Sequence, residues 1–396
     1  MSELITYRLD EIADVIDCEH KTAPNVDSSE YYSIRTPDIK NGRLLYEQAN
    51  RVSAETYDLW TKRGIPEAGD IILAREAPVG EVGWIDKDHK ICLGQRTVLI
   101  KIHSNEIDKK YLLYSFVSPK FKDYLNELSG GSVVAHLNMK DIRALEFSFP
   151  SLPEQKAIAS VLSSLDGKID LLHRQNKTLE AMAETLFRQW FIEEAKEDWE
   201  YVELGTAVET SSGGTPSRKE MSYYEDGSNY WVKSKELNGS FITSTEEMIT
   251  DEAVKKSSAK LLPAYSTLIA MYGATVGEYA LITKPMTCNQ AVCAIKENEA
   301  YPYTFIFMYV KNQKDELINQ AVGSAQQNIS QILIKKLPIP TCTDRIKDYH
   351  HMVHPWFKRM ELNVGQIQTL ENLRDTLLPK LMSGEVRVQY QTEEVA

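Results

Sequence analysis

Two stretches of the chain place apolar residues at alternating steps of three and four positions. This spacing is typical of the narrow seam of a coiled coil, so it predicts two long helices. The alternative is two amphipathic helices that pack on separate cores, although their apolar stripe is usually broader. One asparagine lies on each seam, where it disfavours wrong registers. The seam positions are Leu162, Leu165, Ile169, Leu172, Asn176, Leu179 and Leu186 in the first stretch, and Met360, Asn363, Ile367, Leu370 and Leu377 in the second.

The length of these stretches suggests that they act as spacers. Two helices of about 38 residues would each extend roughly 55 Å at 1.5 Å per residue. If they pair as an antiparallel coiled coil, they hold the two remaining parts of the chain at opposite ends with approximate twofold symmetry. Duplex DNA read in half-sites suits that geometry. Pro355 interrupts the second stretch, so we predict that this helix kinks or begins afresh there.

The whole chain is an internal repeat. The two helical stretches align without a gap at an offset of 191 residues, and the sequences before them repeat more weakly. A period this long indicates duplication of a whole domain rather than a solenoid. The matched segments are Thr178-Leu179-Glu180 with Thr369-Leu370-Glu371, Ile72-Leu73-Ala74 with Leu268-Ile269-Ala270, Val79-Gly80-Glu81 with Val276-Gly277-Glu278, and Gly94-Gln95 with Asn289-Gln290.

The fold class predicted for the two repeated parts is mixed α/β. Short apolar or alternating runs between glycine and proline turns predict strands at 70–74, 98–102, 267–271 and 291–295. Two further segments, 112–124 and 303–314, predict short helices. We therefore divide the chain into a first α/β domain (1–150), a first helical spacer (151–194), a second α/β domain (195–340), a second helical spacer (341–385) and a tail (386–396).

Composition restricts the setting of the protein. The 396 residues lack a run of about 18 apolar residues, which argues against a membrane span, and the N-terminus does not resemble a secretion signal. Five scattered cysteines favour a reducing cytoplasm over a disulfide framework. The net charge of −12 is unusual for a protein that binds DNA alone, because phosphate neutralisation supplies much of the affinity. We expect basic residues gathered on one face, and a partner that supplies further contacts to the phosphates.

Polar loops with glycines occur at matching places in the two α/β domains. Arginine suits guanine, asparagine and glutamine suit adenine, and serine and threonine are adaptable, so these loops are candidates for reading base edges. Any single loop is equally well an ordinary surface turn. Their repetition in both halves favours the binding interpretation. The candidate DNA-contacting residues are Arg35, Thr36, Lys40, Arg75, Ser132 and His136 in the first half, and Thr215, Ser217, Arg218, Lys233, Lys235, Tyr272, Ser324, Gln326, Gln327 and Asn328 in the second.

The sequence contains no strong enzyme motif. An adenine methyltransferase needs an Asn- or Asp-Pro-Pro-aromatic run, and an ATPase needs a phosphate loop that ends in Gly-Lys-Ser/Thr; neither is present. Pro37-Asp38 and Gly69-Asp70 are weak nuclease fragments, since no Glu-X-Lys follows them at a sensible distance. Cys342, His350 and His354 are a weak metal candidate near a helix start. We therefore predict no catalytic, cofactor or metal site in this chain.

Three segments carry a resemblance to a known family. Phe149 to Ala159 reads FPSLPEQKAIA, Gly213 to Ser217 reads GGTPS, and Leu377 to Glu385 reads LLPKLMSGE. Together with the duplicated domain–helix order, they make nearly the whole chain resemble the specificity subunit of type I restriction–modification enzymes. The second helix departs from the family pattern, because it begins with Thr341–Arg345 instead of a Pro-Glu-Gln start.

The resemblance implies a function and a set of partners. Each α/β domain would be a target recognition domain that reads one part of a split, asymmetric site in double-stranded DNA. The helices would set the gap and dock two methyltransferase subunits, which methylate adenine with S-adenosylmethionine. A restriction and translocase subunit that uses ATP and Mg²⁺ would cleave the DNA. A coiled-coil assembly adaptor that reads no DNA sequence remains an alternative, and a stand-alone repressor is disfavoured by the acidic charge.

Overall fold

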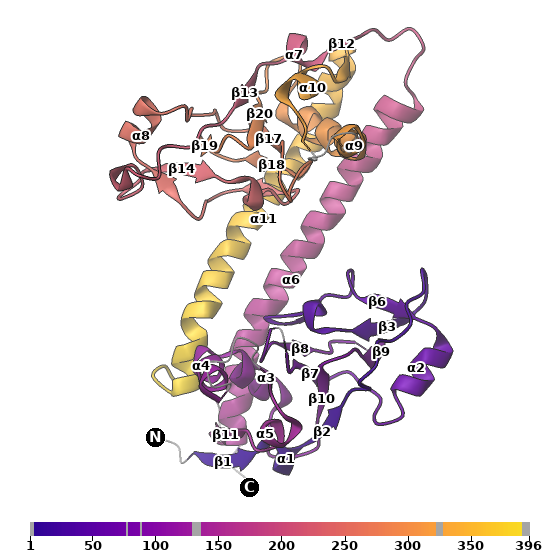
Figure 1. Cartoon of the computed structure of the whole chain (residues 1–396), viewed down its shortest axis with the longest axis vertical. Helices are drawn as coiled ribbons and strands as arrows, with labels where there is room; N and C mark the ends of the chain where they lie inside the picture. Colours follow the sequence, from indigo (N-terminus) through magenta and orange to yellow (C-terminus); the bar gives the residue numbers. More distant parts are fainter. Residues whose placement is uncertain (1–3, 77, 88, 129–135, 322–327, 390–396) are drawn as a thin grey trace. The chain divides into compact units, whose positions relative to one another are not determined.

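The structure is a computed structural model, and it describes residues 4–76, 78–87, 89–128, 136–321 and 328–389 (Figure 1). The chain divides into two compact units. Unit 1 comprises Met1–Lys168 and Leu370–Ala396, and unit 2 comprises Ile169–Thr369. Each unit therefore contains one globular half of the chain together with a segment of each long helix.

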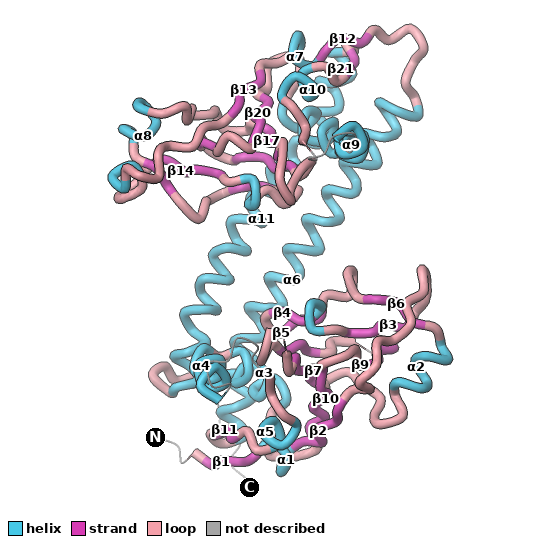
Figure 2. Tube along the Cα trace, in the orientation of Figure 1, coloured by secondary structure: helices cyan, strands magenta, loops and turns pink. Residues whose placement is uncertain are grey.

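The globular part of unit 1 combines strands with short helices (Figure 2). The strands are β1 (Ile5–Arg8), β2 (Ala13–Asp17), β3 (Tyr31–Ile34), β4 (Ile39–Lys40), β5 (Gly42–Leu44), β6 (Asn50–Val52), β7 (Ile71–Ala74), β8 (Val82–Trp84), β9 (Lys90–Leu93), β10 (Thr97–Ile102) and β11 (Glu146–Phe149). The helices are α1 (Leu9–Ile12), the 3-10 turn η1 (Thr36–Asp38), α2 (Ala54–Trp60), α3 (Lys109–Val117), α4 (Pro119–Leu128) and α5 (Met139–Arg143). The predicted helix over 112–124 is two helices, because Ser118 precedes Pro119 and adopts extended backbone.

The sheet of unit 1 separates two cores. Its six strands have the order β2-β10-β7-β8-β5-β4, and β3 lies between β6 and β9 in a second sheet. Successive residues of a strand point to opposite faces. Ile71 and Leu73 of β7 therefore pack with α3 and α4, whereas Ile72 and Ala74 pack with β3 and β9. Burial on both faces explains why β7 is a continuous apolar run rather than an alternating one.

Unit 2 is built from a similar set of elements. Its strands are β12 (Tyr201–Glu203), β13 (Thr210–Ser212), β14 (Asn229–Val232), β15 (Phe241–Ile242), β16 (Met248–Ile249), β17 (Thr267–Ala270), β18 (Tyr279–Ile282), β19 (Thr287–Cys288), β20 (Val292–Ile295) and β21 (Pro338–Pro340). Its shorter helices are α7 (Leu204–Ala207), η3 (Met221–Tyr223), η4 (Ser234–Glu236), α8 (Asp251–Lys256), α9 (Tyr303–Ala321) and α10 (Gln331–Lys335).

The topology of unit 2 repeats that of unit 1. The order β13-β20-β17-β18-β15 matches β2-β10-β7-β8-β5, and β14 lies between β16 and β19 as β3 lies between β6 and β9. The central strand β17 again serves two cores: Ile269 packs with α9, whereas Leu268 and Ala270 pack with β14 and β19. The internal repeat seen in the sequence is thus a repeat of the fold.

The two long helices, α6 (Leu152–Arg188) and α11 (Thr343–Ser383), contact each other inside each unit. In unit 2, Asn363 Nδ2 donates to Asn176 Oδ1 at 2.7 Å, and the buried Tyr349 donates its hydroxyl to the Ala183 carbonyl at 2.9 Å. In unit 1, Leu378 and Leu381 share a core with Leu162. The start of each helix thus meets the end of the other, so the pair is antiparallel.

The predicted seam positions differ in burial. Six are buried and six are half-buried, and the two seam asparagines bond to one another. An amide pair in an otherwise apolar seam favours one register, because any shift would leave it without a partner. The buried positions are Leu162, Ile169, Leu172, Met360, Asn363 and Ile367, and the half-buried ones are Leu165, Asn176, Leu179, Leu186, Leu370 and Leu377.

Of the two predictions for Pro355, a kink or a fresh start of the helix, the fresh start is wrong, since α11 runs without a break from Thr343 to Ser383. A proline inside a helix costs about 3 kcal/mol. Burial of a large apolar side chain contributes roughly 1.5–3 kcal/mol, and Tyr349, Val353 and Phe357 are all fully buried around Pro355. Their burial outweighs the local penalty.

In the described residues we find no helix that is both long and apolar enough to cross a membrane.

Candidate nucleic-acid interface

Four loops of unit 1 are joined by main-chain hydrogen bonds. The Gly94 N–H donates to the Ile34 carbonyl at 2.7 Å, which links the β9–β10 turn to the end of β3. The Arg75 N–H donates to the Arg96 carbonyl at 3.0 Å, and the Leu137 N–H donates to the Arg75 carbonyl at 3.0 Å. The segments near residues 35, 75, 95 and 136 therefore lie together.

The same four loops are joined in the same way in unit 2. The Asn289 N–H donates to the Val232 carbonyl at 2.9 Å, and the Met271 N–H donates to the Ala291 carbonyl at 2.7 Å. The Ile329 N–H donates to the Met271 carbonyl at 2.6 Å. A short β-bridge closes each cluster, Glu76 with His136 in unit 1 and Tyr272 with Asn328 in unit 2. We call these the loop cluster of unit 1 and the loop cluster of unit 2.

A capped 3-10 turn orients one cation in each loop cluster. The Arg35 N–H donates to Asp38 Oδ2 at 2.9 Å, and the Arg35 guanidinium pairs with the same carboxylate. In unit 2 the Lys233 N–H donates to Glu236 Oε2 at 2.7 Å. An acidic residue at the third position of a turn satisfies a main-chain N–H that would otherwise lack a partner. The predicted contact residues Thr36 and Lys235 lie inside these turns.

The basic side chains of the unit 1 loop cluster are paired with acids. Arg75, whose side chain is only 12% exposed, bonds to Asp17 Oδ1 at 3.0 Å. His136 Nδ1 lies 2.6 Å from Glu76 Oε1, and Arg96 bonds to the other oxygen of Glu76 at 2.8 Å. An arginine that is half-buried and paired with an acid holds its neighbours in place more readily than it reaches a ligand. Arg96 is the more exposed cation of this group, with 54% of its side chain accessible.

Two carboxylates hold the predicted cations of unit 2. Arg218 bonds to Glu247 at 2.6 Å and lies over the rings of Tyr224 and Trp231. Lys233 and Lys235 both bond to Glu246, at 3.0 and 2.6 Å. Hydrogen bonds from Lys235 and then Lys233 lower the pKa of Glu246, and the hydrogen bond from Arg218 lowers that of Glu247. Both acids are therefore ionised near neutral pH, and they partly neutralise the three cations.

Of the remaining predicted contact residues, Thr215 donates a hydrogen bond to Gln290 of the unit 2 loop cluster. Lys40 and Ser217 have no hydrogen bond to a loop cluster among the described residues. Lys40 is exposed at the end of β4, and Ser217 is exposed beside Arg218. Ser132, Ser324, Gln326 and Gln327 lie outside the described residues. The assignment of individual DNA contacts therefore stays a prediction.

Sequence reasoning missed a pair of glutamines and the acids that hold the cations. Gln95 and Gln290 are exposed in equivalent turns, and Thr22 and Thr215 each donate a hydroxyl hydrogen bond to the glutamine of their own unit. The signal was available, because the repeat aligns Gly94-Gln95 with Asn289-Gln290. For Asp17, Glu246 and Glu247 the sequence offered no comparable signal.

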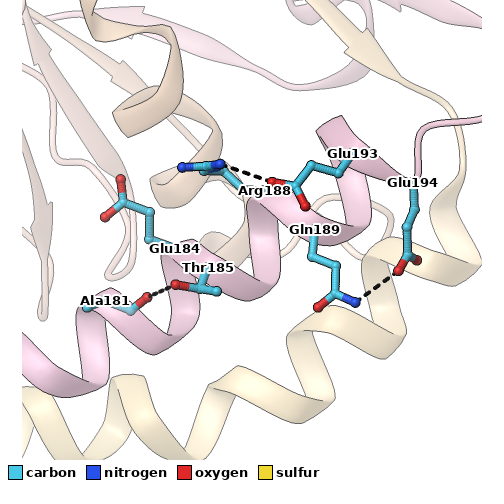
Figure 3. A pocket seen from close by; sticks show the side chains of 7 residues that line it. All are labelled: Ala181, Glu184, Thr185, Arg188, Gln189, Glu193 and Glu194. Carbon is cyan, nitrogen blue, oxygen red and sulfur yellow. Dashed lines mark hydrogen bonds and ion pairs between the residues drawn. The ribbon is translucent and has the colours of Figure 1, made fainter.

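A polar cavity of about 520 Å³ lies beside the end of α6 in unit 2 (Figure 3). It is open to solvent, and it is lined by Glu184, Arg188, Glu193 and Glu194 together with Thr185, Gln189 and Ala181. The helix widens there into the π-helical turn η2 (Gln189–Glu193). Three acids and one arginine make the cavity acidic, so it does not suit DNA.

One group of possible metal ligands occurs among the described residues. Asp17, Cys18 and His20 place their ligand atoms within 4.8 Å of one another. Burial raises the pKa of the Cys18 thiol, and Asp17 already pairs with Arg75. A protonated thiol and an occupied carboxylate are poor metal ligands. The candidate set from the sequence, Cys342, His350 and His354, does not form such a group among the described residues.

His350 makes the stability of unit 2 depend on pH. Burial and the neighbouring His354 and His351 lower the pKa of His350 to about 4, and its Nδ1 lies 2.9 Å from Thr304 Oγ1. Below about pH 6.5 the unfolded chain takes up a proton that the folded chain does not, so stability falls as pH drops towards 4. We expect a loss of about 1–2 kcal/mol, because partial exposure reduces the full effect.

Urea unfolding of the wild type and of His350→Gln at pH 7 and pH 4.5 checks this expectation. Glutamine keeps a hydrogen-bonding group but does not titrate, so the variant should lose less stability over this range. An equal loss in both proteins would contradict the assignment to His350.

Comparison with known proteins agrees with this duplicated architecture. A family model described as the type I restriction modification DNA specificity domain matches residues 1–181 and 196–345. The type I restriction enzyme MjaIX specificity subunit of Methanocaldococcus jannaschii is 26% identical, over 96% of this chain and 93% of that protein. The HindI specificity subunit of Haemophilus influenzae is 21% identical, over 89% and 94%.

A solved structure shares the fold. The S subunit of a type I restriction–modification system from M. genitalium superimposes with a TM-score of 0.61 at 16% identity, and the match covers 99% of this chain and 97% of that one. The fold of two α/β domains with two long helices is thus a known architecture. The chain belongs to the type I restriction modification DNA specificity domain family, and it contains that domain twice.

Proposed function

We propose that this chain is the DNA specificity subunit of a type I restriction–modification enzyme. Each loop cluster reads one half of a split, asymmetric site in double-stranded DNA. The observation that carries the proposal is that the same main-chain framework occurs twice with different side chains. Arg75, Glu76 and His136 in unit 1 correspond to Met271, Tyr272 and Asn328 in unit 2. Identical frameworks with different side chains suit two domains that read different sequences.

In this proposal the chain has no catalytic role and no cofactor of its own. Methylation of adenine N6 from S-adenosylmethionine is assigned to two methyltransferase subunits. ATP- and Mg²⁺-dependent translocation and cleavage are assigned to restriction subunits. The proposed location is the cytoplasm, and it is supported by five free cysteines.

Exposed apolar residues support the docking of two copies of one partner. Leu171 and Met182 are both exposed on α6, and at 11 residues apart they lie on one side of the helix. The repeat offset of 191 residues places Leu362 and Leu373 at the corresponding positions of α11, and both are exposed. The same apolar positions on two related helices suit two identical methyltransferase subunits.

Mapping methylation in cells tests the central proposal. The chain is co-expressed with the methyltransferase of its own system, and methylated adenines in the host DNA are located by sequencing. We expect two short fixed blocks separated by a constant gap, and loss of this pattern when the chain is deleted. Exchange of residues 1–150 for another such domain should change one block only. Methylation that is unchanged without the chain would favour the assembly adaptor.

The stoichiometry of the complex tests the docking surface. Leu171→Glu should reduce the number of bound methyltransferase subunits from two to one, because it places a charge in one apolar contact. Its effect on folding should stay within about 0.5 kcal/mol, since the side chain is exposed. Leu59→Glu, at an exposed leucine of α2, is a matched control, and native mass spectrometry gives the readout. Two bound subunits in the Leu171 variant would contradict this docking site.

A further inference from the structure

The two loop clusters share one exposed side chain that their sequences hold in common. Gln95 lies in the turn between β9 and β10, and Gln290 lies in the turn between β19 and β20. Thr22 Oγ1 donates to Gln95 Oε1 at 3.4 Å, and Thr215 Oγ1 donates to Gln290 Oε1. Both glutamines are exposed. An exposed amide that is oriented in the same way in both units needs an explanation beyond folding.

Close main-chain contacts bring Thr215 to Gln290 in unit 2. In unit 2 the Gly213 N–H donates to the Val292 carbonyl at 3.1 Å, and the Gly214 N–H donates to the Cys288 carbonyl at 2.9 Å. A Cβ atom at Gly213 would lie 2.2 Å from the Asn289 carbonyl, so only glycine allows this approach. The glycines that precede Thr215 therefore serve to place its hydroxyl beside Gln290.

We propose that Gln95 and Gln290 are specificity-determining residues, and that each contacts the major-groove edge of an adenine in its own half of the DNA site. This inference rests on the proposed function. Glutamine recognises adenine by accepting from N6 and donating to N7. Each Oε1 has a second lone pair beside the one that the threonine occupies. Within the described part of the chain, no residue accepts a hydrogen bond from either Nε2.

The role of the two glutamines follows from comparing the residues that the two loop clusters share with the residues that differ between them. Side chains that differ between the clusters, such as Glu76 and Tyr272 or His136 and Asn328, suit the parts of the two half-sites that differ. A residue common to both clusters suits a feature that both half-sites contain. The glutamine amide carries no charge, so it would bind a phosphate more weakly than the nearby cations would. The major-groove edge of adenine, in contrast, offers one acceptor and one donor that match the amide.

The test uses the assembled complex of this chain with its methyltransferase subunits. The methylation map supplies the DNA site, and binding is measured by fluorescence anisotropy on duplexes in which each adenine in turn is replaced by 7-deazaadenine. This base lacks only the N7 acceptor. The wild type should lose roughly five- to 150-fold in affinity at one position in each half-site, the range of a single good base contact.

Glutamine variants then assign the two positions. Gln95→Met keeps the length of the side chain but removes the amide. This variant should bind the unmodified duplex five- to 150-fold more weakly than the wild type does. Replacing the sensitive adenine of the first half-site by 7-deazaadenine should not weaken its binding any further. Gln290→Met should behave in this way at the second half-site only. Thr22→Val and Thr215→Val should weaken the same contacts less, because the amide remains.

Three outcomes would overturn the inference. They are unchanged affinity in the glutamine variants, equal loss on all duplexes including an unrelated sequence, and a variant that remains fully sensitive to 7-deazaadenine. Because the glutamines are exposed, the variants should keep the melting temperature of the wild-type complex, so a binding loss is not a folding loss. A wild-type complex with no preferred split site would instead overturn the proposed function.

Discussion

Gly213→Ala is expected to abolish recognition of the half-site assigned to unit 2 while recognition of the other half-site persists. The new Cβ would lie 2.2 Å from the Asn289 carbonyl and 2.4 Å from the Cys288 carbonyl. Both are main-chain atoms, so no change of rotamer relieves the clash. The local structure must open at a cost of about 2–3 kcal/mol, and Thr215 then leaves Gln290.

Methylation mapping in cells that carry this variant measures the effect. We expect the split motif to lose its second block and keep its first. Gly94→Ala is the mirror experiment in unit 1, where a Cβ would lie 2.5 Å from the Ile34 carbonyl, and it should remove the other block. Gly365→Ala on α11 is the control. No atom lies within 4 Å of its Cβ, so it should stabilise the helix by up to about 1 kcal/mol and leave the motif unchanged. An intact motif in Gly213→Ala would contradict the close approach described here.

The double variant Glu246→Gln, Glu247→Gln is expected to bind DNA more tightly, on specific and unrelated duplexes alike. In the wild type these two carboxylates hold Arg218, Lys233 and Lys235. A phosphate must displace them before it gains the cations. Each exposed ion pair is worth about 0.2–1 kcal/mol, so release of all three cations should raise affinity for any duplex roughly tenfold.

Salt dependence separates this effect from a change in base reading. Each additional phosphate contact steepens the plot of log affinity against log salt by about 0.9. We expect a slope that is steeper by one to two for the double variant, on specific and unrelated duplexes alike. The control is Glu252→Gln with Glu299→Gln, which removes the same charge from pairs with Lys256 and Lys347 outside the loop cluster. Equal affinity gains in both double variants would point to overall charge rather than to Glu246 and Glu247.

Much of the fold follows from local sequence patterns. The step of three and four predicted the long helices, and apolar runs at 70–74 and 267–271 marked the strands β7 and β17. These elements are predictable because periodicity reports which side of an element is buried. The repeat identified the domains, because related sequences adopt related folds. The same alignment matches Gly94-Gln95 with Asn289-Gln290. That match does not indicate a function until the structure shows that the two turns are equivalent.

The charge pairs illustrate what local patterns do not report. Arg75 and Asp17 are 58 residues apart, and Arg218 and Glu247 are 29 residues apart. Which acidic side chain pairs with which basic side chain depends on how strands from distant parts of the chain pair. The sequence therefore indicated cationic loops, whereas the structure shows cations that are largely held by carboxylates. This difference changes the expected behaviour of the site from simple attraction to competition between carboxylate and phosphate.

The sequence by itself determined the duplicated α/β domain, the two long helices and the family resemblance, because all three depend on residue spacing and on similarity between the two halves of the chain. Only the tertiary structure decided that α11 continues through Pro355, that Asn176 meets Asn363, and that Thr22 and Thr215 orient two glutamines. Those features arise from contacts between residues far apart in sequence. The free energy of such contacts, for example that of the apolar burial around Pro355, exceeds the local conformational preferences that sequence patterns report.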